Sequence, residues 1–205
     1  MKIKHIRKHI LIEIIEKYKN NKKVYFKKWA KLLENNKIWI IPTDTLYWLS
    51  SLVTEDNSNK ISKIKKREAN KTYSIIAPNI DYIRSNFIVP ENFKEILKKS
   101  LEKYKKTWIT FILEKKDKNY LPYLWINNKM WVRILNHFIQ DFVNYINKPI
   151  ITTSANISSE DNPIYFKDID SRIIESIDFV IKDDINISWD PSILINNDWS
   201  VFLKR

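Results

Sequence analysis

The complete absence of glycine is the feature that most constrains this chain of 205 residues. Glycine normally makes up about 7% of a protein, because tight turns and close approaches of backbone to ligand need a positive φ or a missing Cβ. Tryptophan, in contrast, occurs eight times. Trp189 opens a Trp-Asp-Pro-Ser run and Trp199 follows Asn-Asn-Asp, and these are turn contexts in which glycine is expected. The chain therefore either builds its turns without glycine or shows tryptophan where the organism inserts glycine.

We hypothesise that most of the eight tryptophans are glycines in the native protein. UGA is read as tryptophan in some genetic codes and as glycine in others, so translation with the wrong table exchanges the two residues. A chain that is simply rich in tryptophan is the alternative. Peptide masses from the native organism distinguish them, because tryptophan at Trp48, Trp131 and Trp189 would contradict the hypothesis.

The charge and the cysteine content limit the classes of function. A net charge of +12 and a pI near 9.6 are typical of proteins with nucleic-acid or other anionic partners. Thirty lysines against six arginines also fit an AT-rich gene, which weakens that argument. The absence of cysteine excludes disulfides and thiolate chemistry. Apolar stretches such as Ile10–Ile15 are too short to span a bilayer, and the start lacks a signal peptide, so we expect a cytoplasmic protein without a membrane partner.

Helical and strand-like segments alternate along the chain, which predicts a single α/β domain with a twisted mixed β-sheet flanked by helices. Residues 3–19 have apolar residues at helical spacing, so we expect an N-terminal helical extension over 1–22 and the main domain over 23–205. Strands 107–113 and 130–135 have no helix between them and are expected to pair antiparallel. The remaining predicted helices are 24–34, 57–66, 91–104, 138–147 and 166–176, and the remaining strands are 37–41, 73–77, 149–153, 178–182 and 192–196.

Three separated segments carry residues with chemical potential. The first is the strand end Ile41–Trp48 (Ile-Pro-Thr-Asp-Thr-Leu-Tyr-Trp). The second is Ile64–Arg67, followed by Asn70-Lys71 and a strand. The third is Val132–His137, followed by the strand and loop of Pro149–Asn156.

Cations and hydroxyls in these segments suit an anionic ligand. Lys65, Arg67 and Lys71 gather at the end of a helix, where the arginine fork and the lysine charges can clamp a triphosphate. Thr45, Ser154 and Asn156 place neutral donors and acceptors at strand ends, where open α/β sheets bind ligands. Each motif alone is typical of a solvated helix face or a turn, so the combination carries the argument.

In this order and spacing, the segments resemble the YrdC-like family of threonylcarbamoyl-AMP synthases. Pro42–Leu49 is similar to the family's Pro-Thr-(Asp/Glu)-Thr-x-Tyr-Gly-Leu strand end and Lys65–Arg67 to its Lys-x-Arg motif. Val132–Leu135 is similar to Val-Arg-x-Pro, and Thr153–Asn156 to the Thr-Ser-Ala-Asn loop. Ser188–Ser192 is similar to a Ser-Gly-x-Pro-Ser segment. The resemblance covers about residues 24–205 and corresponds to the short form without the extra C-terminal domain. The departures are Glu68, Leu135, Ile193 and the tryptophans at the glycine positions 48, 131 and 189.

The resemblance implies an L-threonylcarbamoyladenylate synthase, a nucleotidyltransferase that makes threonylcarbamoyl-AMP and pyrophosphate from L-threonine, bicarbonate and ATP. The product serves a downstream threonylcarbamoyl transferase complex that modifies tRNA to threonylcarbamoyladenosine. Mg²⁺ is expected with ATP, held mainly by the phosphates and by no protein metal site. The residues carried over by motif are Thr45, Arg133, Ser154 and Ser192 for threonine or its carbamate; Lys65, Arg67, Lys71, Lys129, Asn156, Ile164 and Arg205 for ATP; and Lys65, Arg67, Ser154 and Asn156 as the catalytic group.

Several alternatives stay open. A non-catalytic RNA-binding module of the same fold would also fit the basic charge, and weak RNA binding is compatible with the enzyme. Carbamoyl transfer in hydrogenase maturation uses a related domain, but inside much longer chains. We interpret His137 as a structural or pocket-wall residue, not a general base, and His5 and His9 as surface residues. Asp44 is either a catalytic carboxylate or a strand-end cap.

Overall fold

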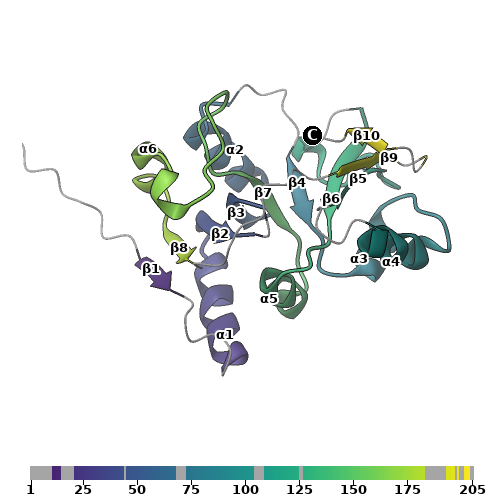
Figure 1. The fold of residues 1–205 in the computed structure, drawn as a ribbon, viewed down its shortest axis with the longest axis horizontal. Coiled ribbons are helices and arrows are strands. Elements are labelled where there is room, and N and C mark those ends of the chain that lie inside the picture. Colours follow the sequence, from purple (N-terminus) through teal and green to yellow (C-terminus); the bar gives the residue numbers. More distant parts are fainter. Residues whose placement is uncertain are drawn as a thin grey trace, which may run out of the picture.

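The computed structural model describes residues 11–14, 21–43, 45–67, 73–103, 109–124, 127–182, 193–196, 198 and 201–203. Within this part of the chain, ten strands form one mixed sheet in the order β1-β8-β2-β3-β7-β4-β6-β5-β9-β10. The sheet runs across the molecule from β1 at one end to β9 and β10 at the other (Figure 1). The strands are β1 (Leu11–Ile14), β2 (Trp39–Pro42), β3 (Tyr47–Leu52), β4 (Ser74–Ile76), β5 (Ile109–Glu114), β6 (Lys129–Arg133), β7 (Ile150–Ser154), β8 (Phe179–Lys182), β9 (Ile193–Asn196) and β10 (Val201–Leu203).

Helices cover both faces of the sheet, as two separate apolar clusters show. One cluster joins the helices α1 and α5 to Trp39, Trp48 and Ile76. The other joins α2, α3, α4 and α6 to Leu49 and Val132, which point to the opposite face. The helices are α1 (Lys22–Leu33), α2 (Glu55–Ile64), α3 (Ile80–Asn86), α4 (Phe93–Lys103), α5 (Phe138–Ile146) and α6 (Ser171–Ile174), with short 3-10 helices η2 (Pro122–Leu124) and η3 (Phe166–Asp168).

Residues other than glycine supply the positive φ angles. The described positions with positive φ are Asn36, Lys66, Leu121, Asn127, Asn128, Asn147 and Ser159. Asparagine tolerates this left-handed region better than other residues with a Cβ, and Asn147 uses it to end α5. Trp48 and Trp131 lie in strands without a positive φ. A glycine at either position would therefore provide space rather than backbone freedom.

Most of the expected elements are confirmed, including the antiparallel pair β5–β6 and the mixed α/β sheet. The leading helix is wrong over Leu11–Ile14, which form a strand parallel to β8. The β-branched run Ile-Leu-Ile-Glu-Ile-Ile fits an edge strand better than a helix, and the rest of the expected extension lies outside the described residues. The expected helix 166–176 is divided into η3 and α6, because Asp170 caps a new helix. No described helix is long and apolar enough to cross a membrane.

Candidate active site

The motif segments meet where β3 and β7 lie side by side. Trp48 of β3 pairs with Ser154 at the end of β7. On the other side of β7 lies β4, which pairs in turn with β6, so that Ile76 lies opposite Arg133. The sheet order therefore brings the first and third motif segments together, although about a hundred residues separate them in the sequence.

Lys65 joins the second motif segment to this strand end. It follows α2 directly, its side chain is only 3% exposed, and its Nζ donates to three acceptors. These are the carbonyl oxygens of Ser154 and Asn156, both at 2.6 Å, and Asn156 Oδ1 at 2.9 Å. The backbone N–H of Ser158 donates to the Lys65 carbonyl at 2.9 Å. Helix α2 and the loop after β7 are thus fixed to each other.

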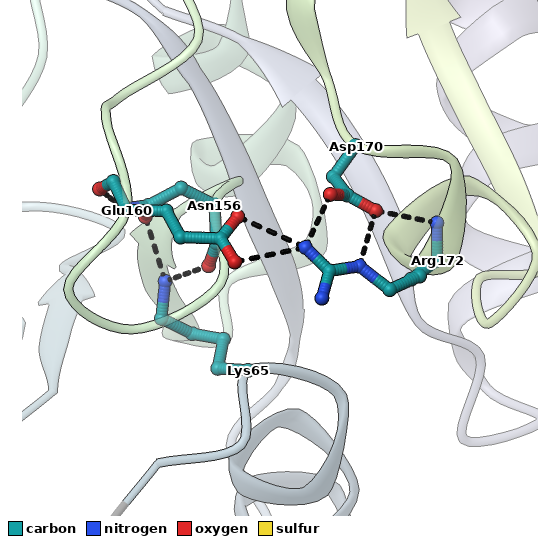
Figure 2. A network of polar contacts seen from close by, with 5 residues as sticks. All are labelled: Lys65, Asn156, Glu160, Asp170 and Arg172. Carbon is teal, nitrogen blue, oxygen red and sulfur yellow. Dashed lines mark hydrogen bonds and ion pairs between the residues drawn. The ribbon is translucent and has the colours of Figure 1, made fainter.

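Ser154 and Asn156 share this network. Ser154 Oγ donates to Asn156 Oδ1 at 2.5 Å, and Asn156 Nδ2 donates to the Glu160 carbonyl at 2.6 Å. Figure 2 shows Lys65 and Asn156 in contact, with Glu160 linked onward to Arg172. The expected catalytic residues Lys65, Ser154 and Asn156 therefore form one hydrogen-bonded group.

Arg67 follows Lys65 by two residues, just beyond the end of α2. Lys66 takes a φ of 50°, and the Arg67 N–H donates to the Ser62 carbonyl at 2.9 Å, as in a helix ending with a left-handed residue. The turn directs the guanidinium onto the Tyr73 ring, 4.5 Å from its centroid, and Nη1 donates to Thr153 Oγ1 at 3.2 Å. Burial lowers the pKa of Arg67, so this partly desolvated cation would gain from an anionic ligand.

Thr45 lies in a compact hydroxyl turn at the end of β2. Its side chain is buried, and its Oγ1 lies 3.3 Å from Thr43 Oγ1. Thr43 also accepts from the Thr45 N–H and donates to the Leu46 carbonyl at 2.8 Å. The sequence interpretation did not single out Thr43, which holds the Thr45 backbone in this turn, although the Pro-Thr-x-Thr spacing marks it. Asp44 lies outside the described residues.

Arg133 is buried on the sheet face that α1 and α5 cover. It is 1% exposed, and its Cζ lies 4.3 Å from the centroid of the Trp48 ring. Trp48 is itself 8% exposed, and its Nε1 is buried without a hydrogen-bond partner among the described residues. Buried indole N–H groups usually have a partner. Trp48 thus contacts Arg133 and packs in the α1–α5 cluster, and the glycine hypothesis at this position stays a prediction.

Five of the predicted site residues fall into two groups in the structure. Lys65, Ser154 and Asn156 contact one another directly, and Arg67 reaches them through Thr153. Thr153 and Ser154 are adjacent in β7, so their side chains leave opposite faces. Arg133 lies on the face of Ser154 and Trp48, because directly paired residues share a face. Arg133 itself is level with Ile150 at the start of β7, and its contact with the Trp48 ring links it to the Ser154 end of that strand.

The other predicted site residues are less closely placed. Lys129 is exposed at the start of β6 and pairs with Glu114; the register of β6, β4 and β7 puts it at the same end of the sheet as Ser154, two strands away. Ile164 is half-buried just before η3. Lys71, Ser192 and Arg205 lie outside the described residues.

His137 has a structural position, in line with the interpretation from sequence. It caps α5 through Nδ1, which accepts from the Ile139 N–H at 3.4 Å, and its ring packs on Phe138. Burial lowers the pKa of His137 to about 4, so the imidazole is neutral at neutral pH.

Two pockets lie near these elements. One of about 300 Å³ opens beside Asn156 and is lined by Ala155, Asn156, Glu160, Asp161, Pro163, Asp168 and Asp170. The second, of about 640 Å³, lies between α1 and α5 and reaches Leu52, at the opposite end of β3 from Trp48. Among the described residues, no group of three or more histidine or acidic side chains could hold a metal ion.

Comparison with known proteins gives the family. Residues 31–201 match the profile of the family named Sua5_yciO_yrdC, described as "Telomere recombination". The chain belongs to this family. It is 31% identical over 175 residues to a Methanocaldococcus jannaschii protein named "Putative threonylcarbamoyl-AMP synthase", covering 85% of this chain and 81% of the relative. It is 33% identical over 151 residues to the "Threonylcarbamoyl-AMP synthase" of Wigglesworthia glossinidia brevipalpis, covering 69% of this chain and 74% of the relative.

Solved structures agree on the fold. P. abyssi Sua5, determined in complex with L-threonine, superposes with a TM-score of 0.71 at 19% identity over 92% of this chain. E. coli YciO superposes with a TM-score of 0.67 at 15% identity, covering 84% of each chain. This chain spans 54% of the P. abyssi protein. At these identities the likeness establishes the YrdC-like fold alone.

Proposed function

We propose that this chain is an L-threonylcarbamoyladenylate synthase that joins L-threonine, bicarbonate and ATP and releases pyrophosphate. The observation that carries the proposal is the hydrogen-bonded group of Lys65, Ser154 and Asn156, with Arg67 beside it at the end of β7. Family membership and the names of the two curated relatives support it. The threonine complex of P. abyssi Sua5 supports L-threonine as one substrate.

The reaction requires the protein to position the substrates and to stabilise the charge that develops on the phosphates. The amine of threonine reacts with bicarbonate to form a carbamate and water. The carboxylate of the carbamate then attacks the α-phosphorus of ATP while the bond to pyrophosphate breaks. Cations at the leaving phosphates lower this barrier without a covalent enzyme intermediate. Mg²⁺ enters with the nucleotide and is held mainly by phosphate oxygens.

The side chains divide this work by charge. Arg67, and Lys71 by motif, would bind the phosphates, because the carboxylates beside Asn156 repel phosphate from the 300 Å³ pocket. Arg133 would pair with a carboxylate of threonine or its carbamate. The hydroxyls of Thr45 and Ser154 would orient that substrate. The product would pass to a threonylcarbamoyl transferase complex that modifies tRNA.

Pyrophosphate release tests the proposal. The assay uses both the chain as it stands and the form carrying Trp48→Gly, Trp131→Gly and Trp189→Gly, with ATP, L-threonine and bicarbonate omitted in turn. We expect release only with all three substrates. Pyrophosphate release without threonine or bicarbonate, or ATP binding without any release, would reject the synthase. RNA binding with a steep salt dependence and no turnover would instead favour the RNA-binding module.

A further inference from the structure

The turn after β7 is held from two sides by cations (Figure 2). On one side stands Lys65, whose ammonium has three N–H donors and makes three hydrogen bonds, to Ser154 and to the backbone and side chain of Asn156. In this arrangement its donors are engaged by the protein. Lys65 therefore holds the turn in place.

The Asn156 carboxamide is nearly saturated as well. Its Oδ1 accepts from both Lys65 and Ser154, and one Nδ2 hydrogen goes to the Glu160 carbonyl. A carboxamide has two donor hydrogens and two acceptor lone pairs, so one N–H is left for a ligand. Because the carboxamide is planar, the direction of that N–H is set jointly by the two donors at Oδ1 and by the Glu160 carbonyl at Nδ2.

Arg172 of α6 fixes Glu160 from the other side. Its Nη2 contacts both carboxylate oxygens of Glu160, at 2.8 and 3.0 Å. Asp170 holds the same guanidinium, through Nε at 2.8 Å and Nη2 at 2.5 Å. The turn also contains Ser159 with a φ of 72°, which is unfavourable for a residue with a Cβ. The ion pair thus links α6 to a turn that contains an unfavourable backbone angle.

We infer that Arg172 is a positioning residue for the nucleotide site. Through Glu160 it fixes the carbonyl that orients the Asn156 carboxamide, and so aims the remaining N–H at the nucleotide. The identity of the ligand rests on the proposed function, whereas the orientation of Asn156 does not. Arg172 and Glu160 are each 48% exposed, so the effect is modest and weakened by salt.

Two readouts on the full chain test this inference. The first is the NMR signal pair of the Asn156 side-chain NH₂ without ligand, and the second is the Kd of ATP by calorimetry without threonine. Arg172→Ala should shift the Asn156 signals and raise the Kd of ATP about two- to fivefold, the range that an exposed ion pair supplies. Arg172→Lys, which keeps the charge but not the fork, should recover part of the affinity.

Arg84→Ala is the matched control, because Arg84 is an exposed arginine of α3 that bonds the Glu91 carbonyl. It should leave both readouts unchanged. Unaltered Asn156 signals in Arg172→Ala would overturn the inference, as would an unaltered Kd in a chain that binds ATP. If neither the unchanged chain nor the form carrying Trp48→Gly, Trp131→Gly and Trp189→Gly binds ATP, the proposed function fails, and the Asn156 signals alone decide the role of Arg172.

Discussion

Replacing Trp48 by glycine should weaken the fold while it opens the site at Arg133. The indole is buried in the α1–α5 cluster and stacks on the Arg133 guanidinium at 4.3 Å. Removing a buried aromatic costs about 3–5 kcal/mol, glycine in a strand adds about 0.5–1 kcal/mol, and the lost cation–π contact adds about 0.5–2 kcal/mol. Removing the buried, unpaired Nε1 of Trp48 offsets roughly 1–3 kcal/mol of this loss of stability.

The net loss of stability is therefore about 4 kcal/mol, which a domain of ordinary stability of roughly 5–15 kcal/mol tolerates. Without the indole, the Arg133 guanidinium can form a charge-assisted hydrogen bond to the carboxylate of L-threonine, which contributes about 1.5–3 kcal/mol. That corresponds to about a tenfold to hundredfold gain in affinity for L-threonine. The added space should also raise the affinity for ATP.

Denaturant unfolding and calorimetric titration with L-threonine measure both effects. Trp29→Gly is the control, because Trp29 is fully buried in the same cluster and packs on Phe26, Phe138 and Phe142. It should lose comparable stability and gain no affinity. If Trp48→Gly loses stability to the same extent and binds threonine no better than the unchanged chain, Trp48 is an ordinary core residue and the glycine hypothesis is wrong at this position.

Three further changes have distinct expected outcomes. Arg67→Ala should lower turnover about 100-fold or more, because it removes a cation that stabilises the leaving group. Lys63→Ala, which removes an exposed cation of the preceding helix α2, should leave turnover unchanged. Arg133→Ala should raise the threonine concentration needed for half-maximal rate and leave the Kd of ATP nearly unchanged. Burial lowers the pKa of His137 from 6.5 to about 4, so the unfolded chain binds the proton more readily. Stability from this group is complete above pH 6.5 and falls by about 3 kcal/mol towards pH 4. His137→Asn should reduce the slope of the unfolding free energy against pH between pH 4 and pH 6.5. An unchanged slope would contradict the lowered pKa of His137.

The sequence predicts the elements whose pattern is local. Helices α1, α2, α4 and α5 have clear 3.6-residue spacing, and β5 and β6 lack a helix between them. Strand β3 was not anticipated, because Tyr47–Leu52 mixes aromatic and serine residues and follows a turn motif. The strand at Leu11–Ile14 was mistaken for a helix, because a short apolar run satisfies both periods and only its pairing with β8 decides.

The motifs identify which residues belong to the site but not what each one contacts. Lys65 donates its hydrogen bonds to the loop of Ser154 and Asn156 because α2 ends close to the end of β7. The relative position of these two elements is a tertiary property that the motif does not contain. The contact of Trp48 with Arg133 requires the strand order β3-β7-β4-β6. The short Asp-x-Arg spacing of Asp170 and Arg172 marks a helix start, yet gives no sign of the link to Glu160.

Product formation from labelled bicarbonate tests the central claim most directly. The chain carrying Trp48→Gly, Trp131→Gly and Trp189→Gly is incubated with ATP, L-threonine and ¹³C-bicarbonate. The products are then separated and their masses are measured by mass spectrometry. The proposed reaction predicts an adenylate that contains one threonine and one ¹³C carbon, formed in equal amount with pyrophosphate. ATP consumed without such an adenylate, or an adenylate without the ¹³C label, would contradict the assignment as a threonylcarbamoyl-AMP synthase.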